Sequence, residues 1–205
     1  QDDARNTNSY NCPIVSAYSD VIRSAMTLHA RLDSPVINFR DEKLLVRQLT
    51  GYLRGLGIDR QTIRRACRQA AAAQDEYTRL VRQKALDLLA ASRREGRLTI
   101  LLAGRPYHTD PLIQHKLSDM IASLGVNVIS EDVVRGDLSV GTGNTRIVRQ
   151  WAYMNRIIKA GQWCAEQPDD LHFVQMTSFG CGPDSFIQDE IRSIMKEHGK
   201  PYTLL

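Results

Sequence analysis

Three loops carry most of the reactive side chains of this 205-residue sequence. Arg105 and His108 follow one short apolar run, Glu131 and Asp132 follow a second, and Cys181 follows a third. The carboxyl ends of neighbouring parallel strands lie along one edge of an open sheet, and ligands bind there. If the three runs are such strands, we expect these five side chains to gather at that edge.

Cys181 has the setting of a chemically useful thiol. Gly180 and Gly182 flank it, and the helix expected from Pro183 begins just after it. The amino-terminal end of a helix favours negative charge, and a thiolate is the form that binds metal or attacks as a nucleophile. The alternative is a turn cysteine without a chemical role. Cys12 stands in a similar place, just before a helix expected to open at Pro13.

The remaining cysteines, Cys67 and Cys164, are expected to be structural. The four cysteines form no C-x-x-C pair, which argues against zinc-ribbon and thioredoxin-like sites. Four unpatterned thiols in a chain of this size fit a reducing, cytoplasmic environment. No apolar run is long enough to span a bilayer, and no signal peptide is visible. We therefore expect no membrane partner.

Arg105 and His108 combine a permanent cation with a titratable donor, which suits binding of a phosphate or a carboxylate. The alternative is a turn set by Pro106 with a solvated histidine. The loop lacks the phosphate-binding pattern of P-loop enzymes, and no G-x-G-x-x-G follows a strand. The sequence also contains no G-x-S-x-G, H-E-x-x-H or EF-hand pattern, so serine-hydrolase and zinc-protease activities have no support.

The elements that must position these residues alternate between strand and helix over 98–205. Strands are expected at 98–103, 126–129, 173–177 and 202–205, with helices from Asp110, from about Arg146 to Gly161, and from Pro183 to Gly199. Strands separated by helices imply right-handed crossovers and a parallel sheet. The sequence therefore predicts an α/β domain with three layers and a four-stranded flavodoxin- or Rossmann-like sheet.

Residues 41–97 are expected to form an added helical segment beside that domain. Asp59 is placed to cap its second helix, and Gly96 to stop it. This segment, with Arg40, holds 14 Lys or Arg against 7 Asp or Glu, whereas the rest of the chain holds 13 against 16. A surplus of seven positive charges suits nucleic acid or an acidic partner, or is a solvated helix face. No aromatic-rich strip accompanies the arginines, so nucleic acid is not favoured.

Residues 1–40 are expected to be the end of a truncated preceding domain. They would contain the helix from Pro13 and a short strand at Val36–Phe39. The sequence starts at Gln1 without an initiator methionine and stops inside an expected strand, which predicts a piece of a longer protein.

Three motifs of this chain resemble the large proteins known as acyl-CoA dehydratase activase-related, or CoA-substrate-specific enzyme activases. They are Asn6-Thr7-Asn8-Ser9-Tyr10-Asn11-Cys12-Pro13-Ile14-Val15, Gly104-Arg105-Pro106-Tyr107-His108-x-Asp110-Pro111 and Ser178-Phe179-Gly180-Cys181-Gly182. Those proteins contain a portion similar to the subunits of 2-hydroxyglutaryl-CoA dehydratase and benzoyl-CoA reductase. The resemblance extends over nearly the whole chain.

The resemblance implies an iron–sulfur protein with Cys12 and Cys181 as two ligands of a [4Fe–4S] cluster. The cluster would serve ATP-driven, low-potential electron transfer to a 2-hydroxyacyl-CoA dehydratase-type reaction, either as a lyase-like part or as an electron-transfer component. Arg105 and His108 would face the cluster or the polar group of the substrate.

The resemblance also implies a further cysteine ligand upstream of the point that matches Gln1. Two thiolates alone are too few to hold four irons. The fragment alone is therefore expected to be inactive and to lack the cluster. The implied partners are the rest of its own longer chain with an ATPase module, and acyl-CoA. The alternative is a metal-free α/β module that binds an anion or a protein partner without catalysis.

Overall fold

The computed structural model describes residues 12–39, 41–110, 112–137, 139–143, 145, 151–177 and 180–205. These residues form two compact units, which divide within one long helix. Unit 1 ends at Tyr77 and unit 2 runs from Thr78 to Leu205. Each unit is described by itself below. None of the helices in the described residues is long and apolar enough to cross a membrane.

Unit 2 is built on a four-stranded sheet in which every strand is parallel to its neighbours. Its strands are β1 (Thr99–Ala103), β2 (Asn127–Ser130), β3 (Leu171–Gln175) and β4 (Tyr202–Leu204), in the order β2-β1-β3-β4. Leu101 of the central strand lies opposite Ile129 on one side and Phe173 on the other. The two central strands are buried at four of their five positions each, as expected for strands covered on both faces.

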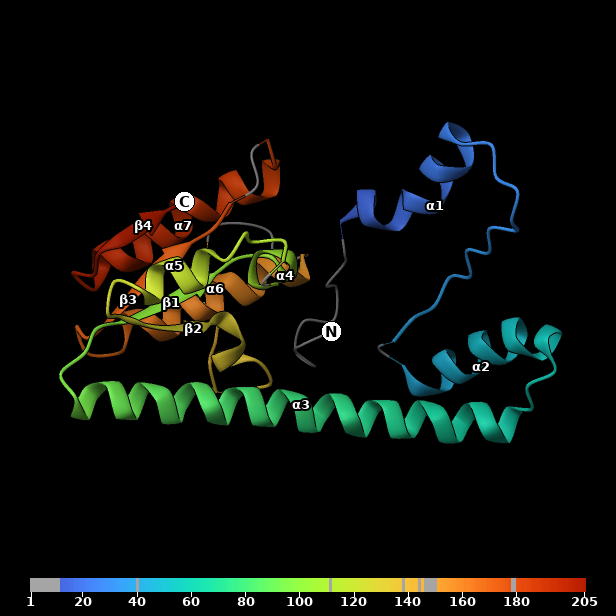
Figure 1. Ribbon diagram of the computed structural model, residues 1–205, viewed down its shortest axis with the longest axis horizontal. Helices are drawn as coiled ribbons and strands as arrows, with labels where there is room; N and C mark the ends of the chain where they lie inside the picture. The colour runs from blue at the N-terminus through green and yellow to red at the C-terminus, as the bar shows by residue number, and fades with distance from the viewer. Residues whose placement is uncertain are drawn as a thin grey trace. The chain divides into compact units, whose positions relative to one another are not determined.

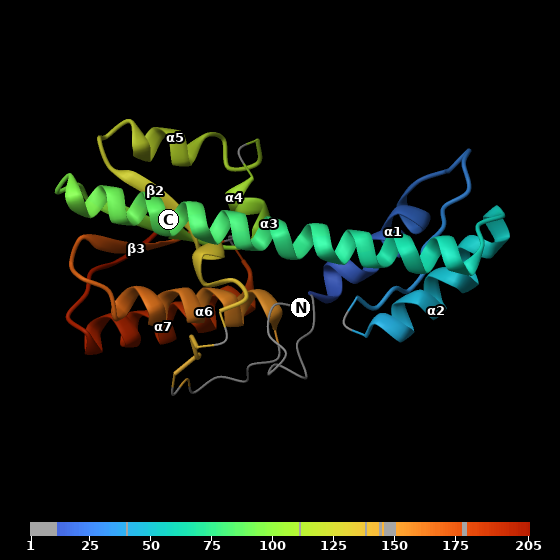
Figure 2. The ribbon, with the colours of Figure 1, turned by 90° about the horizontal axis from the view of Figure 1, so that it is seen from below.

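Helices cover both faces of this sheet. The helices α6 (Ala152–Ala165) and α7 (Gly182–Glu197) pack together on one face, and α5 (Leu117–Ala122) lies on the other (Figure 2). The core between the sheet and these two helices is almost inaccessible to solvent. It contains Leu101 and Phe173 of the strands, Ile157 and Ile158 of α6, and Ile187 and Ile191 of α7. The three-layer α/β fold predicted from the alternation of strands and helices is therefore confirmed.

The strands of unit 2 lie close to their predicted positions, whereas the first helices after β1 do not. The sequence predicted one helix from Asp110. The structure instead has a short α4 (Pro106–Thr109), a run of turns, and then α5. His115 and Lys116 have φ angles of 53° and 60°, in the left-handed region, which interrupts a helix at that point. The predicted helix from Arg146 begins, within the described residues, at Ala152 of α6, because 146–150 lie outside them.

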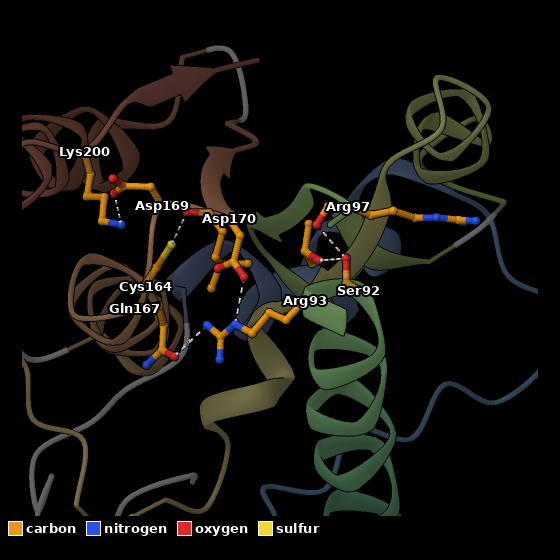
Figure 3. A network of polar contacts seen from close by, with 10 residues as sticks. Ser92, Arg93, Arg97, Cys164, Gln167, Asp169, Asp170 and Lys200 are labelled. Atoms are coloured by element: carbon orange, nitrogen blue, oxygen red, sulfur yellow. Dashed lines mark hydrogen bonds and ion pairs between the residues drawn. The ribbon is translucent and has the colours of Figure 1, made fainter. Parts of the chain in front are cut away.

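The end of α3 (Arg60–Arg94) is anchored to the sheet by polar contacts, shown in Figure 3. The Thr99 hydroxyl donates to the Ser92 hydroxyl over 2.8 Å, and Ser92 donates to the backbone carbonyl of Arg97 over 2.9 Å. Arg93 donates through Nε to Asp170, just before β3, over 2.9 Å. Ala85 and Leu89 of the same helix join the core cluster. The C-terminal half of α3 is thus part of the α/β unit.

Unit 1 contains α1 (Pro13–Ala25), α2 (Glu42–Leu53), the 3-10 turn η1 (Arg54–Leu56) and the first half of α3 (Figure 1). Asp41 caps α2 by accepting from the backbone N–H of Leu44 over 2.8 Å. Asp59 begins α3 in the predicted way, accepting from the backbone N–H groups of Gln61 and Thr62.

The predicted strand at Val36–Phe39 is wrong, because this segment is irregular and has no strand partner within the described residues. The Asn38 backbone N–H donates instead to the side chain of Gln48 over 2.8 Å. A run of apolar residues of this length becomes a strand only where a neighbouring strand supplies its hydrogen bonds.

Candidate functional site

The candidate site lies at the carboxyl edge of the sheet, where Arg105 reaches from β1 toward α7. Arg105 begins α4, two residues after β1. Its Nε atom is 3.2 and 3.3 Å from the two carboxylate oxygens of Asp184, and its Nη2 atom is 2.9 Å from Oδ1. The same Nη2 atom donates to the sulfur of Cys181 over 2.8 Å. One guanidinium therefore holds both a carboxylate and a thiol at the start of α7.

This ion pair is largely withdrawn from water. The side chain of Asp184 is 2% exposed and that of Arg105 is 11% exposed. Burial alone would lower the pKa of Arg105, but the hydrogen bond and the charge of Asp184 outweigh burial, with smaller contributions from Cys181 and Tyr107, and raise it. The guanidinium consequently remains charged, and its charge faces a fixed carboxylate and a sulfur atom.

His108 is tied to the same loop through the backbone. Its Nδ1 atom accepts from the Arg105 N–H over 3.1 Å, and its ring is nearly buried against the edge of Tyr107. Burial lowers the pKa of His108. The charge of Asp184 raises this pKa and the charge of Arg105 lowers it, and the net change is downward. A neutral imidazole that accepts at Nδ1 carries its proton on Nε2. His108 is therefore a hydrogen-bond donor at Nε2.

Gly104 allows the His108 ring to lie close against the backbone that follows β1. A Cβ atom added at Gly104 would lie 2.6 Å from Nδ1 and 3.0 Å from Cβ of His108. Any larger residue would therefore push the imidazole away from the Arg105 N–H.

Cys181 occupies the residue that precedes the first turn of α7. Its backbone carbonyl accepts from the Ser185 N–H over 3.2 Å, and its side chain is half-buried. Gly180 before it has a φ of 78°, a left-handed conformation that favours glycine. The turn thus presents the sulfur at the amino terminus of α7, within hydrogen-bond distance of Arg105.

Glu131 and Asp132 follow β2 as predicted, but the cation with which they pair lies on α6. Both contact Arg156 of α6, Glu131 at 3.4 Å and Asp132 at 3.8 Å. Glu131 is inaccessible to solvent, and its Oε2 atom has no hydrogen-bond partner among the described residues. Burial raises the pKa of Glu131 to about 7, since the charge of Arg156 only partly opposes it. Glu131 is accordingly a buried acid that holds a proton near neutral pH.

The other cysteines belong to unit 1 or to the core of unit 2. Cys12 precedes α1 in unit 1 and is half-buried, and Cys67 is half-buried on α3 in the same unit. Cys164 lies in the core, where burial raises the pKa of its thiol to about 12. In the part of the chain that the structure describes, no group of three or more His, Cys, Asp or Glu side chains is placed to hold a metal ion.

Two residues that were not predicted from the sequence, Asp184 and Arg156, organise these clusters. A signal for Asp184 was present, because an acidic residue in the first turn of a helix is typical of a stabilised amino terminus. No comparable signal marked Arg156, which lies in the middle of an expected helix. The roles predicted for Cys12, Cys181, Arg105 and His108 in binding metal or substrate stay predictions.

Comparison with known proteins agrees with the resemblance seen in the sequence motifs. A family model described as CoA enzyme activase uncharacterised domain (DUF2229) matches residues 1–134, which include Cys12, Arg105, His108 and Glu131. Searches of curated proteins and of solved structures gave no match. Since the matched region covers more than half of the chain, the protein belongs to the family of CoA enzyme activase uncharacterised domains.

Proposed function

We propose that this chain is part of an iron–sulfur protein in which Cys181 and Cys12 supply thiolate ligands to a [4Fe–4S] cluster. Such a cluster supplies one-electron transfer at low potential. In this proposal the electron transfer is driven by an ATPase module elsewhere in a longer protein and serves a 2-hydroxyacyl-CoA dehydratase-type reaction. The observation that carries the proposal is the 2.8 Å contact between Arg105 Nη2 and the sulfur of Cys181 at the start of α7.

Arg105 would serve this site by holding the sulfur rather than by binding a free anion. Asp184 already engages two nitrogen atoms of the guanidinium, so the cation is neutralised on that side. A donor hydrogen bond to a ligand sulfur is one way in which a protein sets the potential of a cluster. We therefore propose a positioning role for Arg105, and for His108 a contact with a polar group of the substrate.

The described residues do not make a complete cluster site by themselves. Four irons take four thiolates, whereas unit 2 brings only Cys181 to this edge, and Cys164 is sealed in the core. The proposal thus concerns ligands that this chain contributes, and it requires others from beyond the described residues.

The test is anaerobic reconstitution with iron and sulfide, followed by iron counting and absorption spectroscopy. The chain would be compared with the longer protein predicted to contain it, and Cys181→Ala and Cys12→Ala with the matched variant Cys67→Ala. We expect about four irons in the longer protein, loss of iron with either of the first two variants, and none lost with the third. Iron that is absent from both proteins would leave a metal-free binding module. Iron that is bound but unaffected by Cys181→Ala would show that Cys181 is not a ligand and would overturn the proposed site.

A further inference from the structure

We propose that the turn between α2 and α3, together with the first turns of α3, is a docking surface for an acidic amphipathic helix of a partner protein. This surface, called here the arginine surface, belongs entirely to unit 1 and does not depend on the cluster proposal. It consists of Arg54, Leu56, Ile58, Arg60, Arg64, Arg65 and Arg68.

The arginine surface carries a net positive charge, with five arginines against one carboxylate. Residues 43–68 contain seven Lys or Arg and a single acid, Asp59. The carboxylate of Asp59 is already used, because it accepts from two backbone N–H groups and from the Thr62 hydroxyl at the start of α3. The five arginines of the surface are exposed, and in the described residues their side chains make no ion pair or hydrogen bond.

The spacing of three of these arginines gives the surface a regular geometry. Arg60, Arg64 and Arg68 follow one another at intervals of four residues along one side of α3. Side chains four residues apart lie about 6 Å apart along a helix axis. Carboxylates at the same interval on a second helix would face them one to one.

The positions of these arginines are electrostatically unfavourable for α3 itself. Arg60 and Arg64 lie in the first turns, where the helix dipole disfavours positive charge. Like charges four residues apart also repel each other. Anionic groups docked on this side would relieve both effects, and they would gain from the partial positive charge at the start of the helix.

Two apolar side chains at the turn distinguish a protein partner from a nucleic acid. Leu56 is 63% exposed and Ile58 is 36% exposed, on either side of Gly57, whose left-handed φ of 80° shapes the turn. An exposed leucine beside arginines suits an interface with an apolar centre and a charged rim. A phosphate backbone would not pack against the exposed leucine. The surface also contains no aromatic side chain on which a base would stack.

The occupant that fits is therefore a helix with carboxylates at every fourth position and an apolar residue at one end. A lipid surface fits less well, because the arginine side of α3 carries no apolar stripe to bury in a membrane.

The test measures binding of a fluorescein-labelled designed helix with glutamates at every fourth position and a terminal leucine. Fluorescence anisotropy at several salt concentrations would compare it with a scrambled peptide of the same composition. Arg64→Glu with Arg68→Glu is expected to weaken binding about tenfold or more, as for other complementary charge pairs. The matched control Arg94→Glu, at the exposed C-terminal end of the same helix, is expected to have little effect.

A second pair of variants tests the apolar part. Leu56→Ser should weaken binding of the peptide, whereas Leu124→Ser, also strongly exposed but in unit 2, should not. Circular dichroism would show that each variant is folded. The proposal is overturned if the designed helix does not bind better than the scrambled peptide, or if Arg64, Arg68 and Leu56 do not matter. It is equally overturned if duplex RNA, or vesicles containing phosphatidylserine, bind more tightly and independently of Leu56.

Discussion

Arg105 donates to the sulfur of Cys181 across 2.8 Å, although 76 residues separate them in the sequence. The contact exists because β1 and β3 are neighbouring parallel strands, so that the loops after them meet at one edge. Asp184, in the first turn of α7, completes the arrangement by fixing the guanidinium. In this geometry a guanidinium fixed by a carboxylate holds the thiol of Cys181.

Removing the carboxylate of Asp184 should destabilise unit 2 strongly. Asp184→Ala leaves the largely buried Arg105 without its counter-charge, and breaking one side of a buried pair costs about 3–5 kcal/mol. Urea unfolding measures this loss. The matched control is Asp189→Ala on the same helix, whose pair with Arg192 is 82% and 58% exposed and should contribute at most about 1 kcal/mol. Similar losses in the two variants would contradict a structural role for the Arg105–Asp184 pair.

Glu131 should make the stability of the protein depend on pH. Its pKa is raised from 4.5 to about 7 in the folded state, so the folded protein keeps a proton that the unfolded chain has already released. The free energy of unfolding should therefore fall as pH rises from about 4.5 to about 7, by up to roughly 3 kcal/mol, and then level off.

Glu131→Gln, which stays neutral, should lack this fall and be the more stable protein above pH 7. Urea unfolding at a series of pH values checks this, with the exposed Glu197→Gln as the control. Parallel pH profiles for the wild type and Glu131→Gln would refute the buried-acid interpretation.

Ser92→Ala should loosen the attachment of α3 to the sheet. The variant leaves the fully buried hydroxyl of Thr99 without its acceptor and the carbonyl of Arg97 without its donor (Figure 3). An unsatisfied buried polar group costs about 1–3 kcal/mol. Thermal or urea unfolding would detect the change, and Ser193→Ala on the exposed side of α7 should leave stability nearly unaltered.

The four cysteines should differ in their reaction with iodoacetamide. Cys164 is buried, and its pKa of about 12 keeps the thiol protonated, so it should be modified only after unfolding. Cys12, Cys67 and Cys181 are half-buried and should react in the native protein. Peptide mass spectrometry with and without urea distinguishes the sites. Rapid native labelling of Cys164 would mean that the core of unit 2 opens easily.

Much of unit 2 was predictable because its signals are local. Runs such as Thr99–Ala103 and Leu171–Gln175 are apolar enough to be buried on both faces, and the helices between them impose the parallel arrangement. The strand bounds differ from the predicted ones by at most two residues. The prediction of one helix from Asp110 was wrong although the apolar residues there have a helical period. The backbone is left-handed at His115 and Lys116, and this interrupts the helix. Periodicity carries no information on such a break.

The sequence by itself determined that Arg105, His108 and Cys181 follow strands of one parallel sheet, since strand order along the chain and apolar runs suffice for that. Only the tertiary structure decided which partners they have. Asp184 takes the guanidinium of Arg105, and Arg156 takes the carboxylates of Glu131 and Asp132. Hydrogen bonds and ion pairs act over a few ångströms, so they depend on how α6 and α7 pack on the sheet. That packing arises from the whole core, not from any one segment.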